Sequence, residues 1–350
     1  MNSLSHETPV FSIITPCFNS EKHIEECIKS VLSQTFQDFE FLIVDDGSFD
    51  SSSKIIEKYA DFDNRIKFFK KENQGQGIQR NFAIKQSKGR YILFLDSDDW
   101  LENNALEKLF NKFQKDDSDV VIFDGFKYEQ KSGKKSFFEY TKFFYKIFKE
   151  RNFSPTKDAK EFTFKINGLT FKAYKREFLI KNDIKFSPTR FIEDSEFYYK
   201  MMLTVEKLSC LKENILNYRI HSSSVTFAQS KRIEDIKYAF FACEKIVKNS
   251  SFNKDKTIIN AFLKNRISQV FYYYKTIKNN PKLKKNYYYL IKEILKYIKR
   301  NYGFDFVTEK SKLEKYNDII KFSFEFYYFS KNLKRKLYLT KIFFKKHFEI

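Results

Sequence analysis

The feature that most restricts the fold of this chain is a short apolar run that ends in a cluster of carboxylates. Residues 91–95, Tyr-Ile-Leu-Phe-Leu, lead directly into Asp96, Asp98 and Asp99. A run of this length predicts a buried strand of a parallel sheet, with the acidic residues at its carboxyl end. Carboxylates this close together repel one another unless a cation separates them, which indicates a site for Mg²⁺ or Mn²⁺ bridging a diphosphate. The alternative is that Asp98 or Asp99 caps a helix that starts just after them.

Strand and helix signals alternate along the N-terminal part of the chain. Residues 10–16, 39–44 and 66–69 are predicted strands, and the apolar spacing of residues 24–34 is typical of a helix with one buried face. This alternation predicts an α/β fold with a doubly wound, mainly parallel sheet flanked by helices. Further elements are expected at residues 80–86, 119–123 and 175–180.

Three motifs follow the carboxyl ends of predicted strands, where sheets of this kind bind their ligands. They are Thr15-Pro16-Cys17-Phe18-Asn19, Asp45-Asp46 and Asp96-Ser97-Asp98. The fold would place them along one crevice, in which a backbone turn and carboxylates suit a nucleotide diphosphate with its cation. The pair Gly75-x-Gly77 lacks the third glycine of a dinucleotide-binding fingerprint, and a simple turn explains it equally well.

Taken together, these residues resemble the family 2 glycosyltransferases with a GT-A fold. The resemblance covers about residues 10–225. It is carried by Ser12 to Asn19, Ser33-Gln34-Thr35-Phe36, Val44 to Ser48, Arg80-Asn81, Leu95 to Asp99 and Glu193-Asp194. It implies transfer of a sugar from a nucleotide-sugar donor.

The same resemblance assigns roles to the residues of the crevice. Asp96-x-Asp98 is the metal-binding motif, with Asp98 favoured as the direct ligand of the cation. The Asp45-Asp46 pair holds the nucleobase and ribose, with Asp46 against the base, and Arg80 lies near the nucleotide.

A second acidic cluster begins with Glu193 and Asp194. Displacing a nucleoside diphosphate from an anomeric carbon requires a base that takes the proton of the attacking hydroxyl. Asp194 is the candidate base, with Glu193 beside it, and the resemblance favours this role. The alternative is that both carboxylates only stabilise the N-terminus of a helix.

A histidine in the central region, His221, is a further candidate ligand. In similar transferases a histidine at this point past the catalytic helix completes the coordination of the cation, so we weigh His221 equally as a contact of metal or diphosphate and as a structural hydrogen-bonding residue. Arg219 is expected to pair with the diphosphate or with a surface carboxylate.

Charge divides the chain near residue 230. Residues 1–230 hold 36 Lys and Arg against 34 Asp and Glu, whereas residues 231–350 hold 29 against 11. We therefore expect a catalytic domain over residues 1–230 and a basic, aromatic-rich helical region over residues 231–350. Such helices suit an anionic membrane surface, and a packed helical appendage is the alternative. The helices are expected at residues 233–247, 258–277, 286–300 and 333–348.

The sequence thus predicts an inverting, metal-dependent glycosyltransferase with Mn²⁺ or Mg²⁺ as cofactor. It would move a sugar from a nucleotide-diphosphate donor to a hydroxyl of a glycan or lipid-linked acceptor, in the synthesis of a bacterial surface glycan such as a lipooligosaccharide or capsule. The chain has no visible secretion signal or spanning run, and its four cysteines are scattered, so we expect a cytoplasmic protein peripheral to the inner face of the cell membrane.

Two other classes of protein remain as alternatives. The basic C-terminal third would suit a protein that binds a polyanion or nucleic acid, although the acidic crevice makes nucleic acid an unfavoured partner. A nucleotidyltransferase on a related fold would need a glycine-rich basic loop after the first strand, which this sequence lacks.

Overall fold

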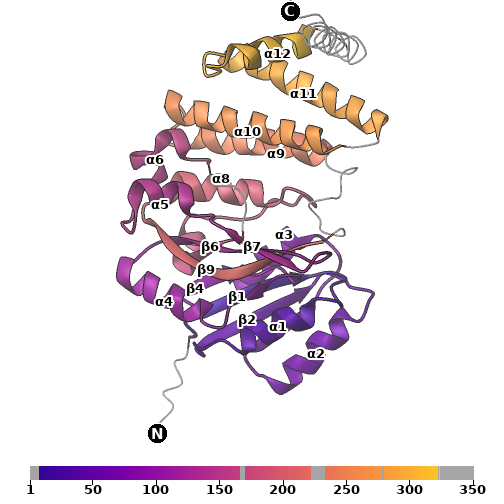
Figure 1. Ribbon diagram of the computed structural model, residues 1–350, viewed down its shortest axis with the longest axis vertical. Coiled ribbons are helices and arrows are strands. Elements are labelled where there is room, and N and C mark those ends of the chain that lie inside the picture. The colour runs from indigo at the N-terminus through magenta and orange to yellow at the C-terminus, as the bar shows by residue number, and fades with distance from the viewer. Residues whose placement is uncertain (1–7, 166–169, 222–232, 278–279, 322, 324–350) are drawn as a thin grey trace, which may run out of the picture. The chain divides into compact units, whose positions relative to one another are not determined.

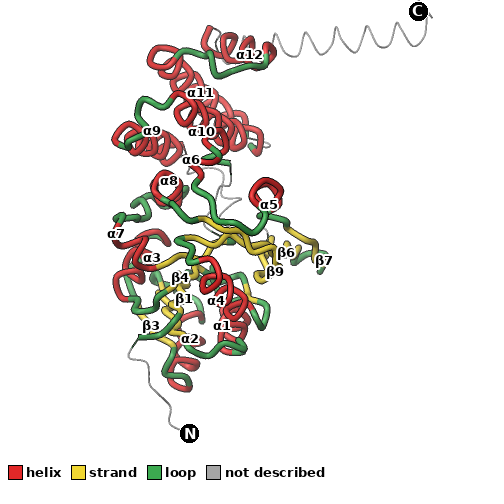
Figure 2. Tube along the Cα trace, turned by 90° about the vertical axis from the view of Figure 1, so that its left-hand side faces the viewer, coloured by secondary structure: helices red, strands yellow, loops and turns green. Residues whose placement is uncertain are grey.

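The computed structural model describes residues 8–165, 170–221, 233–277, 280–321 and 323 (Figures 1 and 2). The chain gathers into two compact units, Met1–Ala228 with Tyr238–Phe262, and Gln229–Lys237 with Leu263–Ile350. The helix expected at residues 333–348 lies outside the described residues. The expected domain boundary near residue 230 remains a prediction.

A single sheet forms the centre of the first unit. In the described part of the chain it has nine strands, in the order β3-β2-β1-β4-β8-β6-β9-β5, with β7 paired to β6. The strands are β1 (Phe11–Cys17), β2 (Phe39–Asp45), β3 (Ile66–Lys70), β4 (Tyr91–Phe94), β5 (Trp100–Leu101), β6 (Val120–Glu129), β7 (Lys134–Phe138), β8 (Lys172–Lys175) and β9 (Leu208–Ile220). The first four strands in this order run parallel, whereas β8 is antiparallel to β4 and to β6. The α/β class with a mainly parallel, helix-flanked sheet is confirmed.

Helices cover both faces of this sheet because its strands are apolar on both sides. The helices of the described chain are α1 (Ile24–Leu32), α2 (Ser52–Phe62), α3 (Gln76–Gln86), α4 (Ala105–Asp116), α5 (Lys142–Phe148), α6 (Pro155–Asp158), α7 (Arg176–Lys181), α8 (Asp194–Thr204), α9 (Ile233–Asn249), α10 (Lys256–Thr276), α11 (Pro281–Tyr302) and α12 (Lys310–Lys321). Phe11 and Ile13 of β1 share a core with α1, α2 and α4. On the opposite face, the Phe94 ring of β4 meets the Phe197 ring of α8, with centroids 5.8 Å apart. The central strands β1 and β4 therefore lie buried between helices on both faces of the sheet.

The sequence-based prediction fails at two places in this unit. No helix begins just after the acidic cluster: Trp100 and Leu101 form β5 and pair with β9, and α4 starts only at Ala105. The helix-cap alternative for Asp98 and Asp99 is therefore wrong. Strands β8 and β9 were not expected, because their partners lie far away in the sequence and their polar residues hide the strand pattern.

The described helices of the C-terminal third confirm three expected segments, since α9, α10 and α11 match residues 233–247, 258–277 and 286–300. In the second unit, Pro281 opens α11, and the Asn280 side chain caps it by accepting from the Leu283 N–H at 2.9 Å. The Tyr288 hydroxyl donates to the Ile319 carbonyl oxygen at 3.2 Å, which ties α11 to α12. Among the described helices, none combines the length and the apolar character needed to cross a membrane.

Candidate active site

The carboxyl end of β4 carries the predicted cation-binding residues. One carboxylate oxygen from each of Asp96, Asp98 and Asp99 lies within 4.8 Å of the others. The backbone N–H of Asp99 donates to the Asp96 carbonyl oxygen at 3.0 Å and so closes the turn. Burial and the Asp96 charge raise the pKa of Asp98, and burial with both neighbouring carboxylates raises the pKa of Asp99 well above its usual range. A divalent cation would offset this crowding, so the donor set fits Mg²⁺ or Mn²⁺.

His221 lies beside this cluster at the end of β9. Its Nε2 is 2.8 Å from Asp98 Oδ2, and its side chain is 13% exposed. The ring of His23, just before α1, lies 5.2 Å from the ring of His221. Burial and the charge of Arg219 lower the pKa of His23 to about 4, which leaves this imidazole neutral at pH 7. His23 is thus a neutral neighbour of His221, and the sequence analysis did not predict it.

Arg219 fixes the acidic turn from the β9 side. Its backbone N–H donates to Asp99 Oδ1 and its Nε donates to the Asp98 carbonyl oxygen, both at 2.8 Å. Its guanidinium pairs with Glu26 and lies 4.5 Å from the centre of the Trp100 ring. A carboxylate, the second of its two expected partners, therefore holds Arg219. The other oxygen of Asp99 is buried and has no hydrogen-bond partner, which makes it available to a cation.

Arg80, on α3, joins the two acidic motifs. Its guanidinium donates to Asp96 Oδ1 at 2.6 Å and to Glu193 Oε1 at 2.9 Å, and its side chain is 3% exposed. Gln76 Nε2 donates to the same Glu193 oxygen at 2.6 Å. Burial raises the pKa of Glu193 to about 7, although the charge of Arg80 opposes that rise. The residues predicted for the metal and those predicted for the base are thus neighbours in space.

Asp194 is the first residue of α8 and directly follows Glu193. It is partly exposed, whereas Glu193 is buried. The preceding Ile192 has φ +63°, a left-handed conformation that is strained for a β-branched residue. Such strain tends to persist where surrounding structure fixes a functional side chain. The first turn of a helix also suits a carboxylate electrostatically, so both interpretations of Asp194 fit this position.

The Asp45-Asp46 pair lies at the carboxyl end of β2, and its carboxylates accept hydrogen bonds from the neighbouring loops. Asp46 accepts from the backbone N–H groups of Gln74 at 2.8 Å and Gly75 at 2.9 Å. Asp45 accepts from the Ser48 N–H at 3.1 Å. Both carboxylates are buried. They hold the backbone that borders the crevice, and their roles toward a nucleobase and ribose stay predictions.

The end of β1 supplies the remaining residues of the predicted crevice. Thr15 and Pro16 are buried inside the strand, and the Thr15 hydroxyl has no hydrogen-bond partner. Asn19 has φ +48°, and its Oδ1 accepts from the Phe49 N–H at 3.0 Å. This bond ties the loop after β1 to the loop after β2, so the two motifs share one edge of the sheet.

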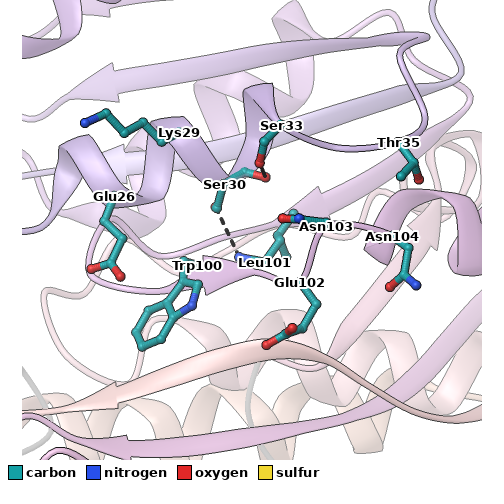
Figure 3. Close-up of a pocket in the computed structure, with 10 residues that line it drawn as sticks. All are labelled: Glu26, Lys29, Ser30, Ser33, Thr35, Trp100, Leu101, Glu102, Asn103 and Asn104. Atoms are coloured by element: carbon teal, nitrogen blue, oxygen red, sulfur yellow. Dashed lines mark hydrogen bonds between the residues drawn. The ribbon is translucent and has the colours of Figure 1, made fainter.

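A shallow cleft of 580 Å³ lies on the α1 side of this region (Figure 3). The Leu101 N–H donates to Ser30 Oγ at 3.1 Å across its floor. Trp100 and Glu26, which both contact Arg219, line it as well. Of the described residues that line this cleft, none is one of the predicted site residues.

Comparison with known proteins identifies the class to which this fold and site belong. The sequence profile of glycosyl transferase family 2 matches residues 12–181. Glycosyltransferase GlyG of Streptococcus pneumoniae serotype 4 is 31% identical over 222 residues, which cover 62% of this chain and 72% of GlyG. The cholesterol galactosyltransferase of Borreliella burgdorferi is 31% identical over 225 residues, which cover 60% of this chain and 59% of that enzyme.

Solved structures support the same fold. Residues 1–349 of TarS from S. aureus, crystallised in complex with UDP-GlcNAc, match with a TM-score of 0.67 and 24% identity, over 82% of this chain and 80% of the TarS chain. The fold is therefore of the GT-A type. The chain belongs to glycosyl transferase family 2, and it is a glycosyltransferase.

Proposed function

We propose that this glycosyltransferase is metal-dependent and inverting, and that it moves a sugar from a nucleotide-diphosphate donor to a hydroxyl group of a glycan or lipid acceptor. The observation that carries the proposal is the buried Arg80, whose guanidinium contacts both Asp96 and Glu193. Through these two contacts, the Arg80 side chain connects the acidic turn after β4 with the acidic start of α8. A reaction that needs a cation at the leaving group and a base at the nucleophile uses such a pair of neighbouring sites.

The cation would be held by Asp98 and His221, with Asp96 and the unpartnered oxygen of Asp99 close by. When bound, Mn²⁺ or Mg²⁺ supplies positive charge that stabilises the departing diphosphate. The chain's own contribution is to fix these ligands: Arg219 holds the turn through the Asp98 carbonyl and the Asp99 carboxylate.

Asp194 would act as the base. Its carboxylate takes the proton of the acceptor hydroxyl while the acceptor oxygen forms a bond to the anomeric carbon. The bond from that carbon to the diphosphate oxygen breaks, and its electron pair leaves with the nucleoside diphosphate. A single displacement of this kind inverts the anomeric configuration.

The donor is proposed to be a nucleotide-sugar, bound along the edge formed by Thr15, Asn19 and the Asp45-Asp46 pair. UDP-sugars are the first candidates, since the TarS crystals contain UDP-GlcNAc. The acceptor is proposed to belong to a bacterial surface glycan or to a lipid, and the name of the Borreliella relative gives a sterol as one acceptor in the family.

The test is release of nucleoside diphosphate from a panel of UDP-, GDP-, CDP- and dTDP-sugars, with Mn²⁺, with Mg²⁺ and with EDTA. We expect hydrolysis of one donor class that EDTA abolishes. Asp98→Asn should remove this activity with the fold retained, whereas Asp61→Asn, which changes an exposed aspartate of α2, should leave it intact. Equal rates in EDTA and in Mn²⁺ would contradict the metal-dependent mechanism.

We further propose that the basic helices bind the anionic inner face of the cell membrane. On α11, Lys285, Lys296 and Lys299 are exposed, opposite a buried face of leucine, isoleucine and tyrosine. Each basic residue near an anionic surface contributes about 1 kcal/mol, and the attraction decays within a Debye length of about 8 Å at physiological salt.

Sedimentation with vesicles tests this membrane proposal. The protein should sediment with phosphatidylserine vesicles and dissociate as salt rises. Changing the three lysines to glutamate should weaken binding by about 100-fold or more. Changing three exposed lysines of the first unit, Lys54, Lys58 and Lys131, provides a control of equal charge. Equal binding to anionic and neutral vesicles would refute the proposal, and tight binding to nucleic acid would favour a polyanion-binding role.

A further inference from the structure

The shallow cleft beside α1 combines an aromatic ring with amide and carboxylate groups. Its volume of 580 Å³ lies within the range of about 300–1,000 Å³ that is usual for ligand sites. The groups that line it include the Trp100 ring of β5, the carboxylates of Glu26 and Glu102, and the amides of Asn103 and Asn104 (Figure 3). The proposed transfer reaction gives no role to this combination of groups.

Trp100 gives the cleft an apolar surface that is held in place from behind. The Arg219 guanidinium lies 4.5 Å from the centre of the indole ring, and the Tyr128 ring lies nearly perpendicular to it, with centroids 5.3 Å apart. Leu101 points into the core, so the alternation of side chains along β5 directs Trp100 away from the core. A ring that is already fixed loses little conformational freedom when a ligand packs against it.

The amides at the α4 side of the cleft are available to a ligand. Asn104 precedes α4 at the position where asparagine commonly caps a helix, but its side chain makes no capping hydrogen bond. Asn103 accepts from the Thr35 N–H at 2.9 Å through its backbone carbonyl oxygen. Both side chains are exposed, and within the described part of the chain neither amide has a hydrogen-bond partner. Each can donate hydrogen bonds from its nitrogen and accept them at its oxygen.

The charges in the cleft restrict the class of ligand that fits it. Each charged side chain that lines it forms an ion pair: Glu26 with Arg219, Glu102 with Lys135, and Lys29 with Glu25. A phosphate or carboxylate would therefore meet two carboxylates and a lysine that is already paired, which disfavours an anionic ligand. A neutral molecule with many hydroxyl groups avoids this repulsion, because carboxylates and amides both form hydrogen bonds with hydroxyls.

Arg219 connects the cleft with the acidic turn. The guanidinium that contacts Glu26 and Trp100 also donates from Nε to the Asp98 carbonyl oxygen at 2.8 Å. Trp100 follows Asp98 by two residues, which span at most about 7 Å of backbone. A molecule in the cleft therefore lies next to the proposed cation site, and an acceptor longer than one sugar could extend from one to the other.

We propose that the cleft binds a neutral sugar unit of an oligosaccharide acceptor, a unit other than the one whose hydroxyl reacts. A pyranose has C–H groups on its faces and hydroxyls around its rim. A face would pack on Trp100, and rim hydroxyls would form hydrogen bonds with Glu102, Asn103 and Asn104. The inference rests on the proposed function, and it selects a glycan over a lipid as the acceptor.

The fluorescence of Trp100 tests this inference, because it is the single tryptophan of the chain. The full chain is titrated in EDTA, without nucleotide, with neutral mono- to tetrasaccharides of glucose, galactose, mannose, N-acetylglucosamine and N-acetylgalactosamine. At least one oligosaccharide should shift the emission, and it should bind about tenfold more tightly than its own monosaccharide, since it also contacts the surface towards the acidic turn. Inorganic phosphate, the anionic comparison, should give no shift.

Matched variants show whether the sugar occupies the cleft. Asn104→Ala should weaken binding about fivefold, as expected for the loss of a hydrogen bond. Asn111→Ala, which changes an exposed asparagine of α4 that does not line the cleft, should bind like wild type. Trp100→Ala should weaken binding about tenfold or more, measured by calorimetry. If Trp100→Ala does not fold, Asn104→Ala decides the question.

Adding donor and Mn²⁺ tests the link with the reaction. The oligosaccharide that binds most tightly should raise the release of nucleoside diphosphate about tenfold or more above the rate with water alone, because a bound hydroxyl replaces water as the nucleophile. Binding that leaves this rate unchanged would overturn the assignment of the cleft to the acceptor.

Two results of the titration would overturn the inference: no neutral oligosaccharide shifts the Trp100 emission, or Asn104→Ala and Asn111→Ala weaken binding equally. Its failure is separate from failure of the proposed function. Donor hydrolysis that EDTA abolishes, without any shift of Trp100 emission, refutes the role of the cleft alone. A shift in a protein that hydrolyses no nucleotide-sugar refutes the proposed function.

Discussion

Replacing Glu193 with glutamine should change the stability of the first unit in a pH-dependent way: compared with wild type, the variant should gain stability as the pH rises from 5 to 8. In the native protein this carboxylate is buried beside Arg80 and Gln76. Glutamine has the same shape, and its carbonyl oxygen can accept the same two hydrogen bonds. It differs in having no proton to release, so the comparison isolates the cost of ionising Glu193 inside the protein.

The size and sign of the effect follow from two pKa values. The pKa of Glu193 takes its ordinary value of 4.5 in the unfolded chain, where water surrounds the side chain. In the folded protein, burial raises this pKa to about 7. Between these values the folded protein keeps a proton that the unfolded chain has lost. The stabilising contribution is therefore complete below pH 4.5 and is lost as pH rises through 7. At about 1.4 kcal/mol per pKa unit, the loss amounts to about 2.5 kcal/mol between pH 5 and pH 8.

Urea unfolding followed by tryptophan fluorescence measures this difference. The chain has one tryptophan, Trp100, and it lies in the first unit, so the signal reports that unit. The free energy of unfolding of Glu193→Gln, minus that of the wild type, should rise by about 2.5 kcal/mol from pH 5 to pH 8. Glu72→Gln, at an exposed position, should give no such trend. A difference that stays constant within about 0.5 kcal/mol would refute the reasoning.

Three other predictions concern packing, thiol reactivity and stereochemistry. In Gly77→Ala the new Cβ would lie 2.9 Å from Glu193 Cβ. This overpacking should lower the free energy of unfolding by about 1 kcal/mol or more, although alanine has the better helix propensity. A more stable variant in the same urea assay would contradict this prediction. Burial raises the pKa values of Cys17 and Cys210 to about 12. These thiols should therefore resist iodoacetamide in the native protein at pH 8 and react with it in urea. Rapid labelling of the native protein, measured by mass spectrometry, would contradict the burial of these two cysteines. The product formed with a hydroxyl acceptor should have the opposite anomeric configuration to the donor by NMR, and retention would require a different role for Asp194.

Local sequence was sufficient to predict strands β1, β2, β3 and β4, but not the order β3-β2-β1-β4 in which they pair. Those strands are short apolar runs, and each ends in a recognisable turn or carboxylate motif. Runs of this kind predict strands from the sequence alone. The rule that ligands bind at the carboxyl ends of parallel strands then brought Asn19, Asp46 and Asp98 to one edge.

Of the other strands, only the start of β6 was predicted, at residues 119–123. Strand β8 reads Lys-Ala-Tyr-Lys, and it is a strand only because β4 and β6 flank it. The contact of Arg80 with Glu193 and that of Arg219 with Glu26 each join residues far apart in the sequence. Pairings of this kind depend on tertiary structure, and local propensity contains no information about them.

The candidate site shows the same division. Residue types suggested a metal and a base, but they did not reveal that the Asp45-Asp46 carboxylates bond to backbone and serine groups of nearby loops. His23 was missed because a single histidine after a strand has no spacing signal, and only its ring contact with His221 draws attention to it.

The role of Asp194 is the central claim, and one pair of rate and binding measurements tests it most directly. Asp194→Asn should lower kcat for nucleotide-sugar turnover about 100-fold or more, the usual scale of general-base catalysis, while affinity for the nucleoside diphosphate with Mn²⁺ stays at the wild-type level. A variant that retains kcat, or one that loses rate and nucleoside diphosphate affinity together, would contradict the account.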